Sequence, residues 1–352
     1  MDVTRRDLLK MAGMAAVSAA VGSLETKTTE AAKSAPKLIQ APVVGCKNVT
    51  GTKYTGSAAK VYFTRKIDAE SLLKLYNLVN GEVYGKIGIK LHTGEPHGPN
   101  ILPRDMVQAF QAQVPNSNII ECNTLYPGAR YTTEGHLETL KTNGWTFCPV
   151  DIMDAEGSVD LPVRGGKHLS SVAMGKNLVN YDSVIVLTHF KGHAMGGFGG
   201  SLKNIAIGMA SGQKGKRQVH GYEGVEMPPP GPSWGDGTMP LKEKFMELMA
   251  DSGKATCDYF GKRIVFLNVM RRMSVDCDCA GTSAEEPTMK DVGMCASTDI
   301  LAIDQACCDF VYTATDSKDL RERMESRHGL HQLQAMRDIG LGNAQYELIS
   351  ID

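Results

Sequence analysis

The sequence has few aromatic residues and almost no net charge. Aromatic residues make up 6% of the 352 residues, and 38 lysines and arginines nearly balance 39 aspartates and glutamates. A protein that binds nucleic acid usually carries a field of basic residues, and stacking of bases or sugars requires aromatic rings. These two shortages argue against a nucleic-acid partner and against a stacking platform.

Hydrophobic runs long enough to cross a membrane are missing as well. The apolar run at residues 11–22 is shorter than the ~20 residues that a membrane-spanning helix needs. It follows Arg5-Arg6 and precedes small residues, which is typical of a twin-arginine (Tat) signal. We therefore predict a Tat signal peptide over residues 1–32, with the Tat translocase as a partner during export. The predicted location is periplasmic or extracytoplasmic, with no stable membrane span. Because Tat carries folded proteins, this address favours a cofactor acquired in the cytoplasm.

The nine cysteines include no Cys-x-x-Cys pair, the spacing that most metal and cluster sites use. Nine is an odd number, so at least one thiol lacks a disulfide partner. Cys277-x-Cys279 and the adjacent Cys307-Cys308 would strain a disulfide bond. We expect free or liganded thiols in place of a disulfide framework.

Alternating strands and helices predict an α/β fold. Residues 33–58 show little periodicity and are read as an extended lead-in to a domain over residues 59–352. The domain is expected to contain one or more parallel or mostly parallel sheets, built from βα units with helices on both faces. A division into two βα halves, about 59–180 and 181–352, is left open. Strands are expected at 60–63, 86–92, 118–122, 183–188, 263–267 and 346–350, and helices at 103–113, 132–142, 241–259 and 299–313. A Gly-rich turn and a helix are expected at about 196–209.

In such folds ligands bind beyond the carboxyl ends of strands, and three polar segments occupy such positions. The first continues strand 86–92 into a turn and reads Lys90-Leu91-His92-Thr93-Gly94-Glu95-Pro96-His97. His92 is a predicted metal ligand, and Lys90 and Glu95 are predicted catalytic residues. The alternative is a solvated loop without a function.

The second segment, residues 189–204, is the richest in histidine and glycine. His189 and His193 follow a buried strand, and a glycine cluster then opens a helix that carries Lys203. Glycines allow a ligand to approach the backbone, and the N–H groups at a helix start attract anions. We predict metal binding by the two histidines and catalytic roles for Lys191 and Lys203, against the alternative of a tight strand–helix connection. The predicted cofactor-binding residues of this segment are Gly196, Gly197, Gly199, Gly200 and Asn204.

The third segment is Asp276-Cys277-Asp278-Cys279, which follows a strand at a short distance. Thiolates are soft ligands for zinc, iron or nickel, so Cys277 and Cys279 are predicted metal ligands, with packing as the alternative. Arg130 follows strand 118–122 and is predicted to bind an anionic group of the cofactor, although a plain turn explains it equally well.

Taken together, these segments resemble the DUF362 family, a family of unknown function. The resemblance rests on Lys90–Pro96, Asn123-Thr124-Leu125-Tyr126, Lys191–Asn204, Cys277–Cys279, Asp291-Val292-Gly293 and Ala302–Ala306. Many members carry a ferredoxin-like insert with Cys-x-x-Cys repeats and are described as iron–sulfur proteins. This chain has a Gly/Pro-rich stretch without cysteine at residues 212–239 instead, which we predict to be a long loop or lid. The histidines and the Gly-Gly-x-x-Lys loop are also similar to those of lactate-racemase-like proteins, which hold a nickel cofactor.

The resulting expectation is an exported metal- or cofactor-dependent enzyme with redox or isomerase chemistry on a small anionic molecule. One alternative is a non-catalytic protein that binds a metal or cofactor. Another is an iron–sulfur electron-transfer protein with a redox partner. The cofactor itself is left open between a metal ion and an iron–sulfur centre.

Overall fold

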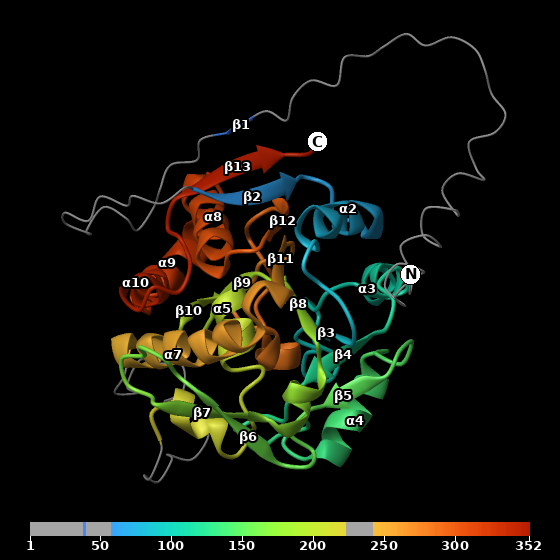
Figure 1. Ribbon diagram of the computed structural model, residues 1–352. Helices are drawn as coiled ribbons and strands as arrows, with labels where there is room; N and C mark the ends of the chain where they lie inside the picture. The colour runs from blue at the N-terminus through green and yellow to red at the C-terminus, as the bar shows by residue number, and fades with distance from the viewer. Residues whose placement is uncertain (1–37, 40–57, 223–241) are drawn as a thin grey trace, which may run out of the picture. The chain divides into compact units, whose positions relative to one another are not determined.

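The computed structural model describes residues 38–39, 58–222 and 242–352 (Figure 1). The chain divides into two units, Met1–Ala35 and Pro36–Asp352, and all described residues belong to the second. The predicted signal peptide at residues 1–32 lies outside the described residues, as does most of the predicted lead-in. None of the described helices combines the length and the apolar character needed to cross a membrane.

A nine-stranded, mostly parallel sheet forms the centre of the second unit (Figure 1). Five neighbouring strands, from β11 to β5, run parallel, whereas β12 is antiparallel to both of its neighbours and β1 is antiparallel to β13. The predicted α/β class is therefore confirmed. In order across the sheet the strands are β1 (Leu38–Ile39), β13 (Tyr346–Ser350), β2 (Ala59–Thr64), β12 (Gly293–Ser297), β11 (Ile264–Met270), β8 (Ser183–His189), β3 (Ile87–Lys90), β4 (Ser117–Glu121) and β5 (Val150–Ile152).

Helices cover both faces of the sheet, because alternate residues of the central strands feed two separate cores. In β8, Val184 and Val186 pack into one core, and Ile185 and Leu187 pack into the other. The first core contains residues of α5 (Ser201–Ala206), α7 (Lys242–Phe260) and α8 (Ile300–Thr313), and the second contains residues of α2 (Ala69–Val79), α3 (Arg104–Gln111) and α4 (Thr133–Thr142). The remaining named elements are β6 (Ser158–Pro162), β7 (Ser171–Gly175), β9 (Lys191–His193), β10 (Gly197–Gly199), α6 (Gly215–Val219), α9 (Lys318–Ser326) and α10 (His331–Asp338), with short 3-10 turns between some of them.

Local chemistry explains where several elements begin. Asp68 caps α2 by accepting a hydrogen bond from the Ser71 backbone N–H at 2.7 Å, and Asp299 caps α8 through Ala302 N–H at 2.9 Å. The predicted Gly-rich turn and helix at about 196–209 are both found: the glycines build the turn and second strand of the β9–β10 hairpin, and α5 begins after them at Ser201. The prediction of a loop without a helix over 212–239 is wrong at Gly215–Val219, which form the short helix α6, and residues 223–239 lie outside the described residues.

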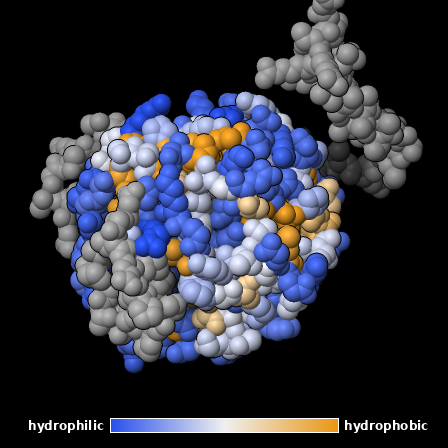
Figure 2. Space-filling model, turned by 90° about the horizontal axis from the view of Figure 1, so that it is seen from below, coloured by the Kyte–Doolittle hydropathy of each residue, from blue (hydrophilic) through white to orange (hydrophobic). Residues whose placement is uncertain are grey.

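On the face drawn in Figure 2, hydrophilic side chains predominate and apolar ones form small separate patches. Large apolar side chains that are exposed in the described part of the chain lie on different elements, for example Leu78 on α2 and Leu137 on α4. Scattered apolar residues of this kind are normal on a protein surface. The features that concentrate chemistry lie inside the fold.

The strand order brings distant segments to one edge of the sheet. Because β11, β8, β3 and β4 are parallel neighbours, the segments that follow them in the chain meet beyond their carboxyl ends. The hairpin β9–β10 is fixed there by Gly192, whose backbone N–H donates to the Ser274 carbonyl oxygen at 2.8 Å. This contact places the His193 segment beside the loop that carries Cys277.

The Gly192→Ala variant should be less stable than the wild type by about 1–3 kcal/mol, the usual cost of overpacking. A Cβ atom at this position would lie 2.1 Å from the backbone oxygen of Val275, which cannot move without displacing the Cys277 loop. Denaturant unfolding measures the effect, and Gly81→Ala is the matched control because nothing lies within 4 Å of its added Cβ. Equal stability of both variants would contradict the close approach of the two segments.

Candidate functional site

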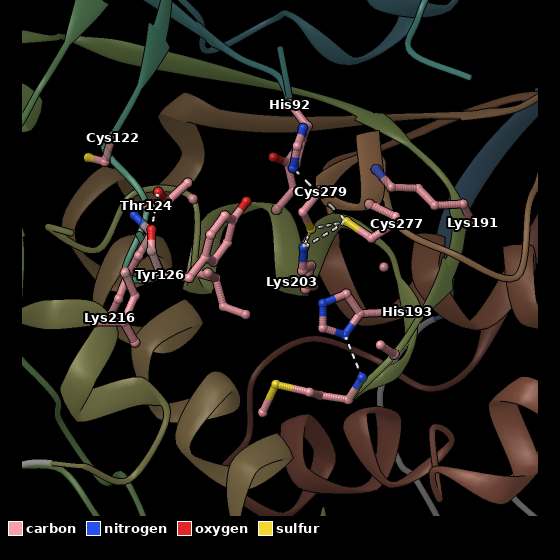
Figure 3. Close-up of a pocket in the computed structure, with 18 of the residues that line it drawn as sticks. His92, Cys122, Thr124, Tyr126, Lys191, His193, Lys203, Lys216, Cys277 and Cys279 are labelled. Carbon is pink, nitrogen blue, oxygen red and sulfur yellow. Dashed lines mark hydrogen bonds between the residues drawn. The ribbon is translucent and has the colours of Figure 1, made fainter. Parts of the chain in front are cut away.

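A cavity of about 270 Å³ lies where these segments meet (Figure 3). It is walled by the ends of β3 and β4, the β9–β10 hairpin, α5, α6 and the Cys277 loop. Of the residues predicted from sequence, those in its wall are Lys90, His92, Arg130, Lys191, His193, Gly199, Gly200, Lys203, Asn204, Cys277 and Cys279. Glu95, His189, Gly196 and Gly197 lie behind the wall.

Three of the predicted metal ligands come together. The Nε2 atom of His92 and the Sγ atoms of Cys277 and Cys279 lie within 4.8 Å of one another. The two sulfurs are 2.7 Å apart, and Cys277 Sγ is 4.0 Å from His92 Nε2. One imidazole and two thiols form a recognised donor set for a transition metal with an open fourth position. It is the one such group of metal-binding side chains within residues 58–222 and 242–352.

The donor atoms would have to adjust to receive a metal ion. In a tetrahedral site with metal–sulfur bonds near 2.3 Å the two sulfurs lie about 3.8 Å apart, so Cys277 and Cys279 must separate by about 1 Å. The Nδ1 atom of His92 accepts a hydrogen bond from the Gly94 backbone N–H at 3.0 Å, which leaves the ring proton on Nε2 facing Cys277. A metal ion would replace this proton, and the ring would have to release the Gly94 N–H.

Lys203 reaches the same sulfurs from α5. Its Nζ lies 3.2 Å from Cys277 Sγ and 3.9 Å from Cys279 Sγ. The Cys279 thiol donates a hydrogen bond to Cys277 and, with the Lys203 ammonium, lowers the pKa of Cys277. Burial raises this pKa, but the two lowering effects are larger, so the pKa lies well below its usual range. Burial lowers the pKa of Lys203, but the negative charge on Cys277 and the other negative groups around it together have the larger effect, and the pKa of the lysine is raised. Cys277 is therefore the thiolate of the pair, ready to bind a metal or to attack an electrophile.

Lys90 is held in a buried ion pair and is not a solvated residue. Its Nζ lies 2.7 Å from Glu121 Oε2 and also donates to the Leu91 carbonyl and to Asn204 Oδ1. Both side chains of the pair are at most 3% exposed. Burial would raise the pKa of Glu121, but Lys90, His92 and Arg130 outweigh burial and hold it far below its usual range.

Arg130 and Glu95 form a second pair beside the first. The Arg130 Nη2 atom lies 2.8 Å from Glu95 Oε1, which also accepts a hydrogen bond from the Tyr126 hydroxyl at 2.6 Å. The Glu95 carboxylate is thus occupied by protein donors, whereas Arg130 and Tyr126 both contribute to the cavity wall. This geometry gives Glu95 the task of orienting Arg130.

Asp278, between the two cysteines, ties the Cys277 loop to the β8–β9 segment. Its carboxylate lies 3.0 Å from Lys191 Nζ and 3.0 Å from His189 Nδ1. The other ring nitrogen of His189 faces the Arg271 carbonyl oxygen at 2.7 Å, so neither nitrogen points to the sulfurs. His193 does line the cavity, but its Nδ1 accepts the Gly196 backbone N–H and it lies outside the group of three donors.

The glycines of this region have different tasks. Gly196 accepts a hydrogen bond from Gln332 through its carbonyl, and Gly197 approaches the Gly329 backbone with a φ of +78° that favours glycine. Gly199 and Gly200 face the cavity, and Gly200 packs on Asp304. The Asp304 carboxylate accepts the Ser201 and Leu202 N–H groups and so fixes the start of the helix that carries Lys203.

Sequence reasoning missed Glu121, Tyr126 and Lys216 as residues of the site, and it assigned no role to Asp278. Glu121 carried a usable signal, because it is a charged residue at the carboxyl end of a strand, directly after two isoleucines. Lys216 carried none, since it lies in the Gly/Pro-rich stretch that the sequence predicts to be a long loop or lid.

The model of the family "domain of unknown function (DUF362)" matches residues 87–309, which contain every residue of the site. No curated protein matches the chain.

Solved structures that are similar to this chain include the following two. One is the lactate racemase apoprotein of Thermoanaerobacterium thermosaccharolyticum, with 15% identity, a TM-score of 0.41, and coverage of 72% of this chain and 57% of that one. The other is a structural-genomics protein from Thermotoga maritima, with 12% identity, a TM-score of 0.41, and coverage of 73% and 60%. This chain therefore spans under two thirds of the length of either structure. Because the family match extends over more than half of the sequence, the chain belongs to the DUF362 family.

Proposed function

We propose that this protein is a metal-dependent enzyme that carries out redox or isomerase chemistry on a small anionic molecule. We also propose that it acts outside the cytoplasm, on the strength of the Arg5-Arg6 signal pattern. The observation that carries the proposal is the group formed by His92, Cys277 and Cys279. His92 lies some 185 positions before the two cysteines in the chain, yet the donor atoms of all three residues lie within 4.8 Å of one another in the wall of a cavity.

The remaining wall supports an anionic substrate. Lysine and arginine side chains converge on the cavity from four segments, and most of them are fixed by buried carboxylates that prevent them from moving. Fixed charges of this kind stabilise an anion better than water does, because they need not reorganise during the reaction. The sulfurs and the lysines line the same cavity, so one small molecule can contact the sulfurs and the lysines at once.

Chemically, a metal held by two thiolates and one imidazole supplies an open position that polarises a substrate oxygen. Lys203 would then hold or deliver a proton next to that oxygen, because its Nζ already lies 3.2 Å from Cys277 Sγ. Lys191 is kept in place by Asp278 and adds positive charge to the wall. A four-cysteine iron–sulfur cluster is not proposed, since within the described residues the group of donors at the cavity contains two cysteines, Cys277 and Cys279.

Elemental analysis tests the proposal directly. The protein is purified without oxygen from its native host, and its metal content per chain is measured by mass spectrometry before and after treatment with a chelator. We expect about one transition-metal ion per chain, removed by the chelator and restored by reloading. A folded, metal-free protein that takes up no transition metal would contradict the proposal.

A second candidate is a metal-free enzyme that uses Cys277 as a nucleophile. Three donors already surround its sulfur: Lys203 Nζ, the Cys279 thiol and the Nε2–H of His92. An activated thiolate beside a lysine is a common arrangement in covalent catalysis. Stoichiometric alkylation of Cys277 in active, metal-free protein, with loss of turnover, would favour this candidate over the metal enzyme.

A further inference from the structure

Within residues 58–222 and 242–352, all but one of the lysine and arginine side chains that line the cavity have a negative partner. Five cationic side chains line the cavity. Four of them have a negative partner: Lys90 contacts Glu121 at 2.7 Å, Arg130 contacts Glu95 at 2.8 Å, Lys191 contacts Asp278 at 3.0 Å and Lys203 contacts Cys277 at 3.2 Å. The fifth is Lys216.

Lys216 is 5% exposed, and its Nζ donates to the Ala210 carbonyl oxygen at 2.7 Å. No carboxylate of the described chain lies within the 4.0 Å of a direct ion pair with it. Asp154 and Glu121 act on it from farther away, and both have other partners: Asp154 accepts backbone N–H groups, and Glu121 is paired with Lys90. Among the described residues this buried ammonium has one carbonyl as its hydrogen-bond partner; such burial is costly, and a bound anion would remove that cost.

The helix that carries Lys216 is held firmly in place. The Gly215 backbone N–H donates to Ser211 Oγ at 3.0 Å, and Gln218 Oε1 accepts the Ala173 N–H of β7 at 2.8 Å. A Cβ atom on Gly215 would lie 1.8 Å from the Ala173 carbonyl oxygen, so this face of α6 packs directly on the β7 backbone. Lys216 is therefore presented to the cavity from a fixed support.

The position of Lys216 separates it from the sulfurs. Figure 3 shows Lys216 with Thr124 and Cys122 on one side of the cavity, and His92, Cys277 and Cys279 on the other. Burial lowers the pKa of Lys216, because the charged ammonium is less well solvated in the cavity wall than in water. A molecule that spans the cavity would place one end at this lysine and its other end at the sulfurs.

We propose that Lys216 binds the anionic group of the substrate, a carboxylate or a phosphate, at the end of the cavity opposite Cys277 and Cys279. The part of this proposal that concerns the reaction at the sulfurs rests on the proposed function, whereas the anion site itself does not depend on it. It defines the substrate as a small molecule with an oxyanion at one end and its reacting group at the other. Lys216 is thus the residue that selects the substrate, and it does not take part in the reacting group's chemistry.

The test measures binding of acetate and of inorganic phosphate by titration calorimetry, with each probe used separately. Lys216→Met should weaken binding of the preferred probe by at least about 10-fold, since a charge-assisted hydrogen bond is lost. Lys214→Met is the matched control, because Lys214 lies two residues away, is more than half exposed and pairs with Asp160 on the surface. The preferred probe shows whether the group is a carboxylate or a phosphate.

Metal content separates this proposal from the proposed function. Lys216→Met should retain the metal content of the wild type while losing affinity for the anion. If the protein contains the metal but binds the anion equally well with and without Lys216, the proposed anion site is wrong and the proposed metal enzyme still stands. Lys216-dependent binding in a protein that takes up no metal would overturn the metal enzyme and leave the anion site standing. Absence of binding in the wild type, or equal binding in Lys216→Met, would refute the anion site.

Chemical labelling of the wild type decides the matter if Lys216→Met fails to fold. Acetic anhydride acylates accessible amines, and mass spectrometry follows the rate at each lysine. The preferred anion should slow acylation of Lys216 by about 10-fold or more and leave Lys214 unchanged. Equal rates at Lys216 with and without the anion would refute the proposal.

Discussion

Replacing Cys277 with serine is expected to lower the affinity for the metal ion by at least about 100-fold. Loss of a residue that merely orients a ligand already costs 10–100-fold, and Cys277 is a direct ligand in the proposed site. It is also the sulfur that the Cys279 thiol and Lys203 keep as a thiolate, the form that binds metals. Competition titration with a coloured chelator measures the affinity of the purified variant.

The chain offers two matched controls for this experiment. Cys122 lines the same cavity but donates to the Met209 carbonyl and lies outside the donor group, and Cys148 lies elsewhere in the fold. Cys122→Ser and Cys148→Ser should both bind metal as the wild type does, whereas Cys279→Ser should behave like Cys277→Ser. If Cys277→Ser kept the wild-type affinity, the metal would have to be bound elsewhere, or the thiolate would serve as the nucleophile of the second candidate.

Much of the frame of the site was accessible from the sequence because it depends on local patterns. Buried strands of apolar residues and helices of 3.6-residue period predicted the βα alternation, and their order placed three polar segments beyond strand ends. The rule for doubly wound sheets then applies to β3, β4, β8 and β11, which are parallel neighbours. That His92 meets Cys277 follows from this topology and from no local signal.

The partners of the site residues could not be predicted, because each pair joins segments far apart in the chain. Lys90 is 31 positions from Glu121, and His189 is 89 positions from Asp278. Sequence alone therefore made His189 and His193 look equivalent. The structure separates them, since His189 has both ring nitrogens bonded behind the wall while His193 faces the cavity.

The glycine-rich segment shows a different limit. Glycine permits both a tight hairpin and the start of a helix, so the run from Gly196 to Gly200 did not distinguish them. Long-range contacts decide the outcome: the Gly196 carbonyl accepts from Gln332, and Asp304 accepts the first N–H groups of α5. Both partners lie more than 100 positions further along the chain.

The Glu121→Gln variant should lose about 3–5 kcal/mol of stability, the usual result of removing one partner from a buried ion pair. Glutamine preserves the shape and can still accept the Thr93 N–H, but it leaves the Lys90 ammonium without a counter-charge at 1% exposure. Arg130, 3.7 Å from Glu121, loses a second negative neighbour. Urea unfolding measures the free energy, and Glu138→Gln on the exposed Lys141–Glu138 pair should change it by less than about 1 kcal/mol.

The pH dependence provides an independent check on the same pair. Because the folded protein holds the pKa of Glu121 below the ordinary value of 4.5, the ionised carboxylate stabilises the fold fully above that value. This contribution is lost as the pH falls below 4.5 toward the lowered pKa. Wild-type stability should therefore decline more steeply with acid than that of Glu121→Gln, and the two curves should converge at low pH. Parallel curves, or a loss below 1 kcal/mol at neutral pH, would mean that the Lys90–Glu121 pair is not the buried support of the cavity that its 2.7 Å contact indicates.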